Sequence, residues 1–124
     1  MKKVMVVEDD KALLNIYRKM IGVKYWVEGV ADGEAAVEKL KKYLPDLLFL
    51  DLEMPKLDGL GVLKVMKKKG WLAKVPVVIL SNYSNPEVID RALAMGARGY
   101  VKKEEIELEQ VLDECRKYLE SDKV

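Results

Sequence analysis

The sequence predicts an α/β domain of the doubly wound type, in which helices cover both faces of one parallel sheet. Strand-like apolar runs alternate strictly with helix-like periods along all 124 residues. Three of these runs are continuously apolar, which indicates strands buried on both faces and therefore paired in parallel. No linker rich in proline or serine, no repeat and no low-complexity tract interrupts the pattern. We therefore expect a single domain across residues 1–124.

Five stretches are rich in the apolar and aromatic residues that favour strands. They are residues 3–7, 25–30, 47–50, 75–80 and 99–101. Each is followed by a segment of helical periodicity, so the chain consists of five strand–helix units. Right-handed crossover connections between such units produce one open sheet.

The five helical segments each carry apolar residues three and four positions apart, which predicts one core-facing stripe per helix. The stripes are Leu13, Ile16, Tyr17, Met20 and Ile21; Ala36, Val37 and Leu40; Leu60, Leu63 and Met66; Val88, Ile89, Ala92 and Leu93; and Leu108, Val111, Leu112, Cys115 and Leu119. The cysteine lies within a stripe, so we expect a buried and unreactive thiol.

Boundary residues support these helices. Asp32 and Asp58, each followed by glycine, start two helices, and Asn85 before a proline caps another. Lysines at 67–69 followed by Gly70 end a helix, because they suit the negative end of its dipole and glycine permits a left-handed cap.

Composition excludes several classes of function. The 22 basic and 21 acidic residues give a net charge of +1, so no field of one sign attracts nucleic acid or a membrane surface. There is no histidine, which excludes a phosphohistidine on the chain itself, and the one cysteine excludes an internal disulfide. No apolar run approaches ~18 residues and the start is too charged for a signal peptide. We expect a cytoplasmic protein.

Three acids stand directly behind apolar runs: Glu8 and Asp9 after the first, and Asp51 after the third. An uncompensated carboxylate at the end of a buried strand costs several kcal/mol, on the order of. If the first and third strands are neighbours, the acids meet in one crevice beyond the sheet. We interpret them as a cation-holding, phosphoryl-accepting site. Periodicity alone leaves the strand order open.

Four segments carry a family resemblance: VVEDD, LLFLDLEMPKLDG, PVVILS and GARGYVKK. In this order and spacing, they resemble the receiver domains of two-component response regulators from end to end. The resemblance implies a flavodoxin-like sheet in the order 2-1-3-4-5, and one receiver domain in residues 1–124.

The resemblance also implies roles for the acids. Asp51 would be the phosphoacceptor, forming an acyl phosphate. Oxygen ligands without nearby histidine or cysteine indicate Mg²⁺. Asp9, Asp51 and the backbone carbonyl of Glu53 would bind the ion directly, and Glu8 would act through water. Taken by themselves, Glu8 and Asp9 could instead form a capping cluster ahead of the first helix, close to Asp10.

Three further residues match the family pattern. Ser81 would hydrogen-bond a phosphoryl oxygen, although a lone serine after a strand is usually a turn residue. Lys103 would pair with the phosphoryl group; its position three residues after Tyr100 selects it over Lys102. Tyr100 is either a half-buried strand aromatic or the switch aromatic that turns inward when Ser81 moves.

The expected function is a signalling switch and not a turnover enzyme. A sensor histidine kinase or a histidine phosphotransfer protein would phosphorylate Asp51, and the face formed by the fourth helix, fifth strand and fifth helix would change its partner affinity. The readout would be another protein or an output domain missing from this chain. Direct contact with nucleic acid or a membrane is not expected.

Two other readings stay open. Glu53 stands where aspartyl-phosphate phosphohydrolases carry a general acid. Glu104 replaces the family's usual proline, which leaves open whether the preceding bond is cis or trans, and Asn82 replaces a small residue; both would suit a pseudo-receiver that binds partners without phosphorylation. Glu53 and Tyr83 occupy positions that tune phosphoryl lifetime, with an effect of unknown sign.

Overall fold

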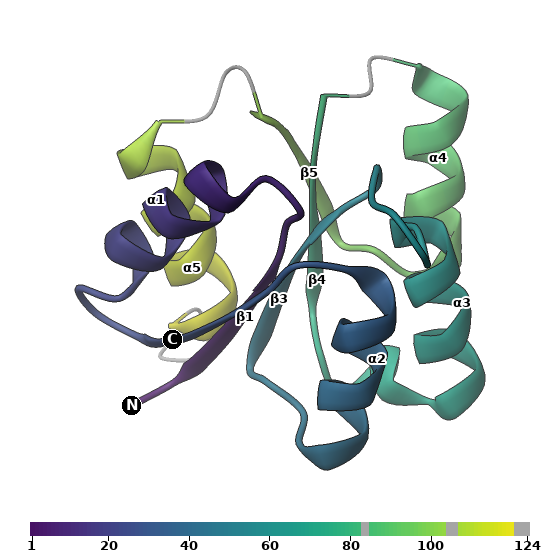
Figure 1. The fold of residues 1–124 in the computed structure, drawn as a ribbon, viewed down its shortest axis with the longest axis horizontal. Coiled ribbons are helices and arrows are strands. Elements are labelled where there is room, and N and C mark those ends of the chain that lie inside the picture. Colours follow the sequence, from purple (N-terminus) through teal and green to yellow (C-terminus); the bar gives the residue numbers. More distant parts are fainter. Residues whose placement is uncertain (83–84, 104–106, 121–124) are drawn as a thin grey trace.

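The computed structural model describes residues 1–82, 85–103 and 107–120. Within them the chain forms a five-stranded parallel sheet in the order β2-β1-β3-β4-β5, with helices on both sides (Figure 1). The predicted α/β class and strand order are confirmed.

The elements alternate along the chain as expected. They are β1 (Lys3–Val7), α1 (Lys11–Ile21), β2 (Trp26–Val30), α2 (Gly33–Lys42), β3 (Leu47–Asp51), α3 (Gly59–Lys69), the short 3₁₀ helix η1 (Trp71–Ala73), β4 (Val77–Ser81), α4 (Pro86–Met95), β5 (Gly99–Lys102) and α5 (Leu108–Leu119).

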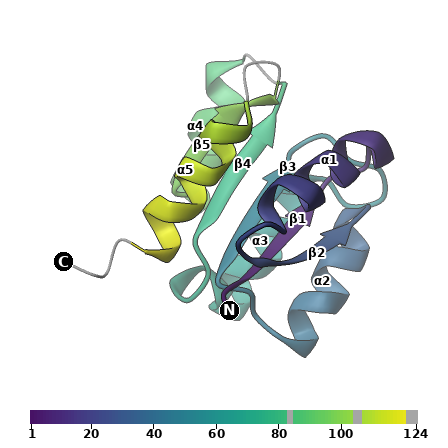
Figure 2. The ribbon, with the colours of Figure 1, turned by 90° about the vertical axis from the view of Figure 1, so that its left-hand side faces the viewer.

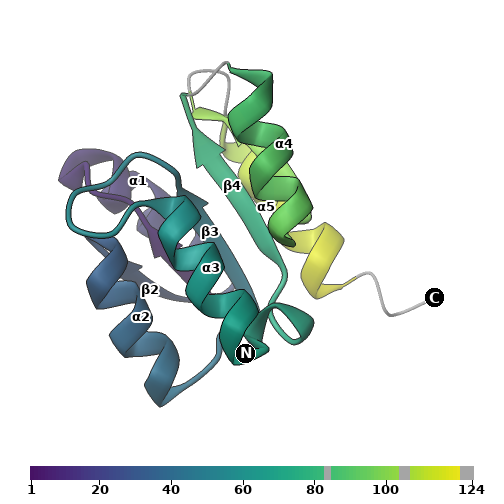
Figure 3. The same ribbon diagram turned by 90° about the vertical axis from the view of Figure 1, so that its right-hand side faces the viewer.

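The sheet separates two hydrophobic clusters. One contains buried residues of α2, α3 and α4, and these three helices lie together in Figure 3. The other contains buried residues of α1 and α5, which lie on the opposite face (Figure 2). We call the latter the α1/α5 cluster. Because successive strand residues point to opposite faces, Val4 and Val6 belong to the α1/α5 cluster while Met5 and Val7 belong to the other.

The register brings the carboxyl ends of the strands to one edge. Val7 in β1 is paired with Leu50 in β3, and Asp51 at the end of β3 is paired with Leu80 in β4. Ser81 at the end of β4 is paired with Lys102 in β5. Residues that follow these strands therefore share one rim of the sheet.

The predicted helix boundaries are confirmed. The side chains of Asp32, Asp58 and Asn85 accept hydrogen bonds from backbone N–H groups in the first turns of α2, α3 and α4. Gly70 ends α3 with a φ of 78°, a left-handed conformation that suits glycine. Cys115 is buried as predicted, and burial raises the pKa of its thiol to about 12. Among the helices of the described residues, none has the length and apolar character needed to cross a membrane.

Two predicted core positions are wrong. Ile16 is 47% exposed and Leu93 is 40% exposed, whereas Leu14 and Val62, outside the predicted stripes, are buried. These errors lie at the margins of stripes, where a small rotation of the helix decides which side chain reaches the core.

The start of β4 also differs from the prediction. It begins at Val77 and not at residue 75, because Pro76 has no N–H to donate. The carbonyl of Pro76 nevertheless accepts a hydrogen bond from Leu48 at 3.0 Å. Tyr25 precedes β2, since its N–H donates to the carbonyl of Ile21 and so closes the turn after α1.

Candidate functional site

The rim of the sheet brings the three predicted acids together. Glu8 and Asp9 follow β1, and Asp51 ends the adjacent β3. One carboxylate oxygen from each residue lies within 4.8 Å of those from the other two. The predicted meeting of these acids in one place is confirmed. Asp10 is the residue that caps α1, by accepting from the N–H of Leu13 at 3.0 Å, so capping does not account for Glu8 and Asp9.

Glu8 and Asp51 are buried, whereas Asp9 is exposed. Glu8 extends the pairing of β1, since its N–H donates to the carbonyl of Val30 at 2.9 Å. The strand alternation that turns Val6 toward the α1/α5 cluster therefore turns Glu8 to the same face. Asp51 continues β3 in the same way. Glu8 and Asp51 therefore stand at the end of the α1/α5 cluster that borders the rim of the sheet, where burial keeps water from solvating them.

Lys103 is the cation that the fold supplies. Its Nζ lies 2.6 Å from Glu8 Oε1 and 3.0 Å from Asp51 Oδ2, and its side chain is 12% exposed. Lys103 follows β5, two strands away from β3 in the sheet, and crosses to reach both carboxylates. Lys103, which is predicted to bind the phosphoryl group, thus contacts Asp51, the predicted phosphoacceptor, directly.

Burial dominates the electrostatics of the pair of buried acids. It raises the pKa of Glu8 to about 7 and also raises the pKa of Asp51, although hydrogen bonds from Lys103 oppose both shifts. For Lys103, burial lowers the pKa, but hydrogen bonds to Glu8 and Asp51 outweigh it and the net shift is upward. One ammonium group therefore does not fully compensate the carboxylates, and an added cation would be favoured here.

Backbone contacts fix the orientation of the acids. Asp51 Oδ1 accepts from the N–H of Glu53 at 3.0 Å, and Glu8 Oε2 accepts from the N–H of Asp10 at 3.0 Å. The backbone of Glu53 thus lies against Asp51, while a metal-binding role for its carbonyl remains a prediction. Gly59 packs closely against the end of β3. A Cβ at this position would lie only 2.5 Å from the carbonyl oxygen of Asp51, so a larger residue does not fit without a shift.

Ser81 and Tyr100 are in contact beside the acids. Ser81 is buried at the end of β4, and the hydroxyl of Tyr100 donates to its backbone carbonyl at 3.2 Å. The ring of Tyr100 is half-buried and packs against the cluster of α2, α3 and α4. Asn82 is exposed directly after Ser81. The predictions for Tyr83 and for Glu104, including the bond before it, lie outside the described residues.

Tyr17 in α1 is a site neighbour that the sequence did not single out. It was predicted only as a member of a core stripe, and it is 1% exposed. Burial raises the pKa of its hydroxyl to about 12, and the charges of Glu8 and Asp51 add to the shift. The sequence does contain a signal for this residue. Tyr17 is a polar-tipped side chain within an otherwise apolar stripe, on the helix that directly follows Glu8 and Asp9.

Comparison with known proteins decides the family. The pattern of the response regulator receiver domain matches residues 4–116. The chain belongs to the response regulator receiver domain family. Such domains are signalling switches of two-component systems that interact with histidine kinases or phosphotransfer proteins.

Solved receiver domains share its fold closely. The receiver domain of the Francisella response regulator 1452 has a TM-score of 0.88 at 25% identity, covering 99% of this chain and 100% of that one. The Vibrio cholerae chemotaxis protein CheY4 has a TM-score of 0.87 at 27% identity, covering 96% and 99%.

The curated relatives are longer proteins. The gliding motility regulatory protein of Myxococcus xanthus is 40% identical over 83 residues, which are 67% of this chain and 11% of the relative. The uncharacterized transcriptional regulatory protein YvfU of Bacillus subtilis is 32% identical over 127 residues, covering 100% of this chain and 62% of the relative. The receiver domain thus corresponds to only part of either relative.

Proposed function

We propose that this receiver domain, residues 1–124, takes a phosphoryl group on Asp51 from the phosphohistidine of a sensor histidine kinase or a histidine phosphotransfer protein. The observation that carries the proposal is the buried Asp51 carboxylate with Lys103 Nζ at 3.0 Å and two more carboxylates within 4.8 Å. The reaction is an in-line displacement on phosphorus, which needs a positioned nucleophile and positive charge around the transferred group.

The transfer balances as one bond made and one broken. A carboxylate oxygen of Asp51 forms the P–O bond while the P–N bond to the donor histidine breaks, and the departing imidazole takes up a proton. The N–H of Glu53 and the ammonium of Lys103 hold the two oxygens of Asp51 in place. The chain therefore supplies positioning and electrostatics, with the acyl phosphate as the product.

The residues fit a Mg²⁺ site. Glu8, Asp9 and Asp51 offer oxygen atoms within 4.8 Å of one another, and oxygen ligands are those that Mg²⁺ prefers. Asp9, Asp51 and the Glu53 carbonyl would bind it directly, with Glu8 acting through water. When bound, the ion neutralises charge on the phosphoryl oxygens. The raised pKa of the buried Glu8 supports this proposal, because burial disfavours its negative charge and a nearby cation would offset that cost.

Lys103, Ser81 and Tyr100 convert phosphorylation into a conformational change. Lys103 leaves the carboxylates for the phosphoryl oxygens, and Ser81 donates to one of them. Because the Tyr100 hydroxyl donates a hydrogen bond to the backbone carbonyl of Ser81, a shift of Ser81 changes the position of the tyrosine ring. A coupling of ~1–3 kcal/mol suffices for regulation of this kind.

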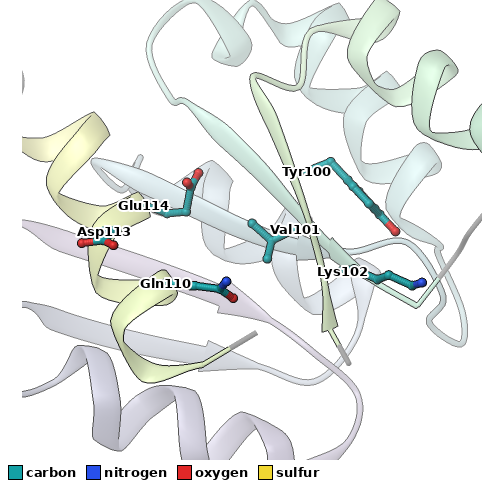
Figure 4. A pocket seen from close by; sticks show the side chains of 6 residues that line it. All are labelled: Tyr100, Val101, Lys102, Gln110, Asp113 and Glu114. Carbon is teal, nitrogen blue, oxygen red and sulfur yellow. The ribbon is translucent and has the colours of Figure 1, made fainter. Parts of the chain in front are cut away.

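The readout surface is the α4–β5–α5 face. A hollow of about 420 Å³ lies between β5 and α5, lined by Tyr100, Val101, Lys102, Gln110, Asp113 and Glu114. Figure 4 shows Val101 pointing toward α5 while Tyr100 and Lys102 point to the other side of β5. A partner that spans α4, β5 and α5 would contact both this hollow and the side of β5 that carries Tyr100. The partner is a protein or an output domain, met in the cytoplasm, and the domain itself is not a turnover enzyme.

The test is phosphorylation by acetyl phosphate with Mg²⁺, followed by intact-mass analysis. Wild type gains one phosphoryl group, and Asp51→Asn gains none. Asp90→Asn, a change at an exposed aspartate of α4, serves as the control and behaves as wild type. Omitting Mg²⁺ prevents the modification. A wild-type protein that takes no phosphoryl group would instead be a pseudo-receiver, and multiple turnover of a phosphate ester would indicate a phosphohydrolase.

A further inference from the structure

Tyr17 carries a hydroxyl that the structure does not explain by packing alone. The residue is 1% exposed in the α1/α5 cluster, and its hydroxyl has no hydrogen-bond partner among the described residues. The other buried tyrosine of this cluster, Tyr25, donates its hydroxyl to Glu120. The two tyrosines of this cluster thus differ in whether the hydroxyl has a hydrogen-bond partner within the part of the chain that the structure describes.

An unpaired buried hydroxyl is unfavourable, and phenylalanine would fill the same space without that penalty. Tyr17 is buried in the α1/α5 cluster, on the face of the sheet to which Glu8 turns, so its hydroxyl lies on the same side as the buried acids. The charges of Glu8, Lys103 and Asp51 all act on its pKa, which agrees with this placement. With a pKa of about 12 it keeps its proton at neutral pH and is available as a donor.

Glu8 is the acceptor that would need such a donor. Its Oε2 accepts from the N–H of Asp10, and its Oε1 is held by Lys103 Nζ at 2.6 Å. If Lys103 moves to a phosphoryl group, Oε1 loses its cation while the residue stays fully buried. Because a buried carboxylate oxygen without a partner is costly, a replacement donor favours the phosphorylated state.

We propose that Tyr17 is a positioning residue that donates a hydrogen bond to the Glu8 carboxylate, directly or through one water molecule, once Lys103 has turned to the phosphoryl group. This inference rests on the proposed function of Asp51. Tyr17 thereby holds Glu8 in the orientation needed to support Mg²⁺. The Tyr17 hydroxyl donates no hydrogen bond to a described residue in the unphosphorylated domain and donates one to Glu8 in the phosphorylated domain.

The test measures Mg²⁺ affinity by calorimetry, with and without saturating beryllofluoride as the phosphoryl analogue. For Tyr17→Phe, we expect Mg²⁺ affinity to fall about tenfold in beryllofluoride, the size expected for a hydrogen bond to a charged group. Affinity for Mg²⁺ alone stays unchanged, because Lys103 still holds Glu8. The ligand-free variant is at least as stable to urea as wild type.

Tyr25→Phe is the matched control. It removes a hydrogen bond from the same cluster, so it lowers stability in both states and leaves both Mg²⁺ affinities as in wild type. In a Glu8→Gln background, Tyr17→Phe changes the affinity in beryllofluoride by less than about twofold, because the acceptor charge is gone.

Other outcomes overturn the proposal. An equal loss of affinity with and without beryllofluoride, or no loss at all, would show that Tyr17 is a core residue only. Failure of Tyr17→Phe to fold would show that the hydroxyl acts before any phosphoryl group arrives. A wild-type protein that does not bind beryllofluoride would remove the proposed function itself, a result that is read from wild type and is therefore distinguishable.

Discussion

Glu28 and Glu8 have similar neighbours but opposite electrostatics. Glu28, on the edge strand β2, lies 2.8 Å from Lys39 Nζ and accepts from the hydroxyl of Tyr43. These hydrogen bonds lower the pKa of Glu28. Glu8 also contacts a lysine and has a tyrosine nearby, yet burial raises its pKa to about 7.

The difference lies in solvation and in how the lysine is shared. The Glu28 side chain is 30% exposed and has Lys39 as its ion-pair partner, so its charge is satisfied by neighbours and water. Glu8 is fully buried and shares Lys103 with Asp51. Glu28 forms a structural pair at the surface, whereas Glu8 belongs to a group of acids that remains short of positive charge.

The largest expected effect comes from removing Lys103, and removal of Lys39 is the matched comparison. Lys103→Met lowers the free energy of unfolding by about 4 kcal/mol at neutral pH without Mg²⁺, because it leaves two buried carboxylates uncompensated. Lys39→Met costs less than about 1 kcal/mol, since its pair is solvated. Urea unfolding measures both. Equal losses would abolish the distinction between the two regions.

The pH dependence separates Glu8 from Glu28 in sign. The folded pKa of Glu8 lies above its ordinary value, so the folded protein binds the extra proton and stability declines as pH rises from 4.5 to about 7. The decline is about 3 kcal/mol in metal-free wild type relative to Glu8→Gln. For Glu28, whose pKa is lowered, the contribution is instead lost as pH falls below its ordinary value.

This pH prediction is checked by urea unfolding in EDTA at several pH values. Glu28→Gln is the control, and its difference from wild type shrinks only on acidification. A wild-type protein that became more stable relative to Glu8→Gln as pH rose from 4.5 to 7 would contradict the burial-driven shift of Glu8.

Mg²⁺ is expected to stabilise only the region that is short of positive charge. At a hundredfold excess over its dissociation constant, it adds about 2.7 kcal/mol to the free energy of unfolding. Asp9→Asn loses most of this gain while changing the metal-free protein little, because Asp9 is exposed. Glu28→Gln keeps the full gain. Thermal melts with and without Mg²⁺ give the comparison, and an undiminished gain in Asp9→Asn would exclude it as a ligand.

The smallest effect is expected at Tyr43. Tyr43→Phe removes the hydrogen bond to Glu28 and lowers the free energy of unfolding by about 1 kcal/mol, since water replaces the lost donor. Chemical denaturation at neutral pH measures it. A loss several times larger would mean that Glu28 is less solvated than its exposure indicates.

Much of the fold was predictable because each boundary has a local cause. Apolar runs placed the strands, and the caps at Asp32, Asp58 and Asn85 marked helix starts. Ile16 and Leu93 were misplaced because periodicity defines the direction of a stripe better than its width. The strand order came from the family resemblance, since local patterns carry no information on which strands are neighbours.

The composition of the site was also predictable, but its contacts were not. The meeting of Glu8, Asp9 and Asp51 followed from their places behind neighbouring strands. The direct contact of Lys103 with Glu8 depends on how far a long side chain reaches across the sheet. The burial of the Tyr17 hydroxyl likewise arises only when α1 packs on the sheet.

Gly59, the first residue of α3, lies against the backbone of Asp51 and Leu52 at the end of β3. A methyl group there would lie 2.5 Å from the carbonyl oxygen of Asp51 and 2.7 Å from the Cα of Leu52. Such a group would act as a wedge under the end of β3, tilting the carboxylate without altering any charged atom. The direction in which the Asp51 carboxylate points thus depends on the absence of a side chain eight positions further along the chain.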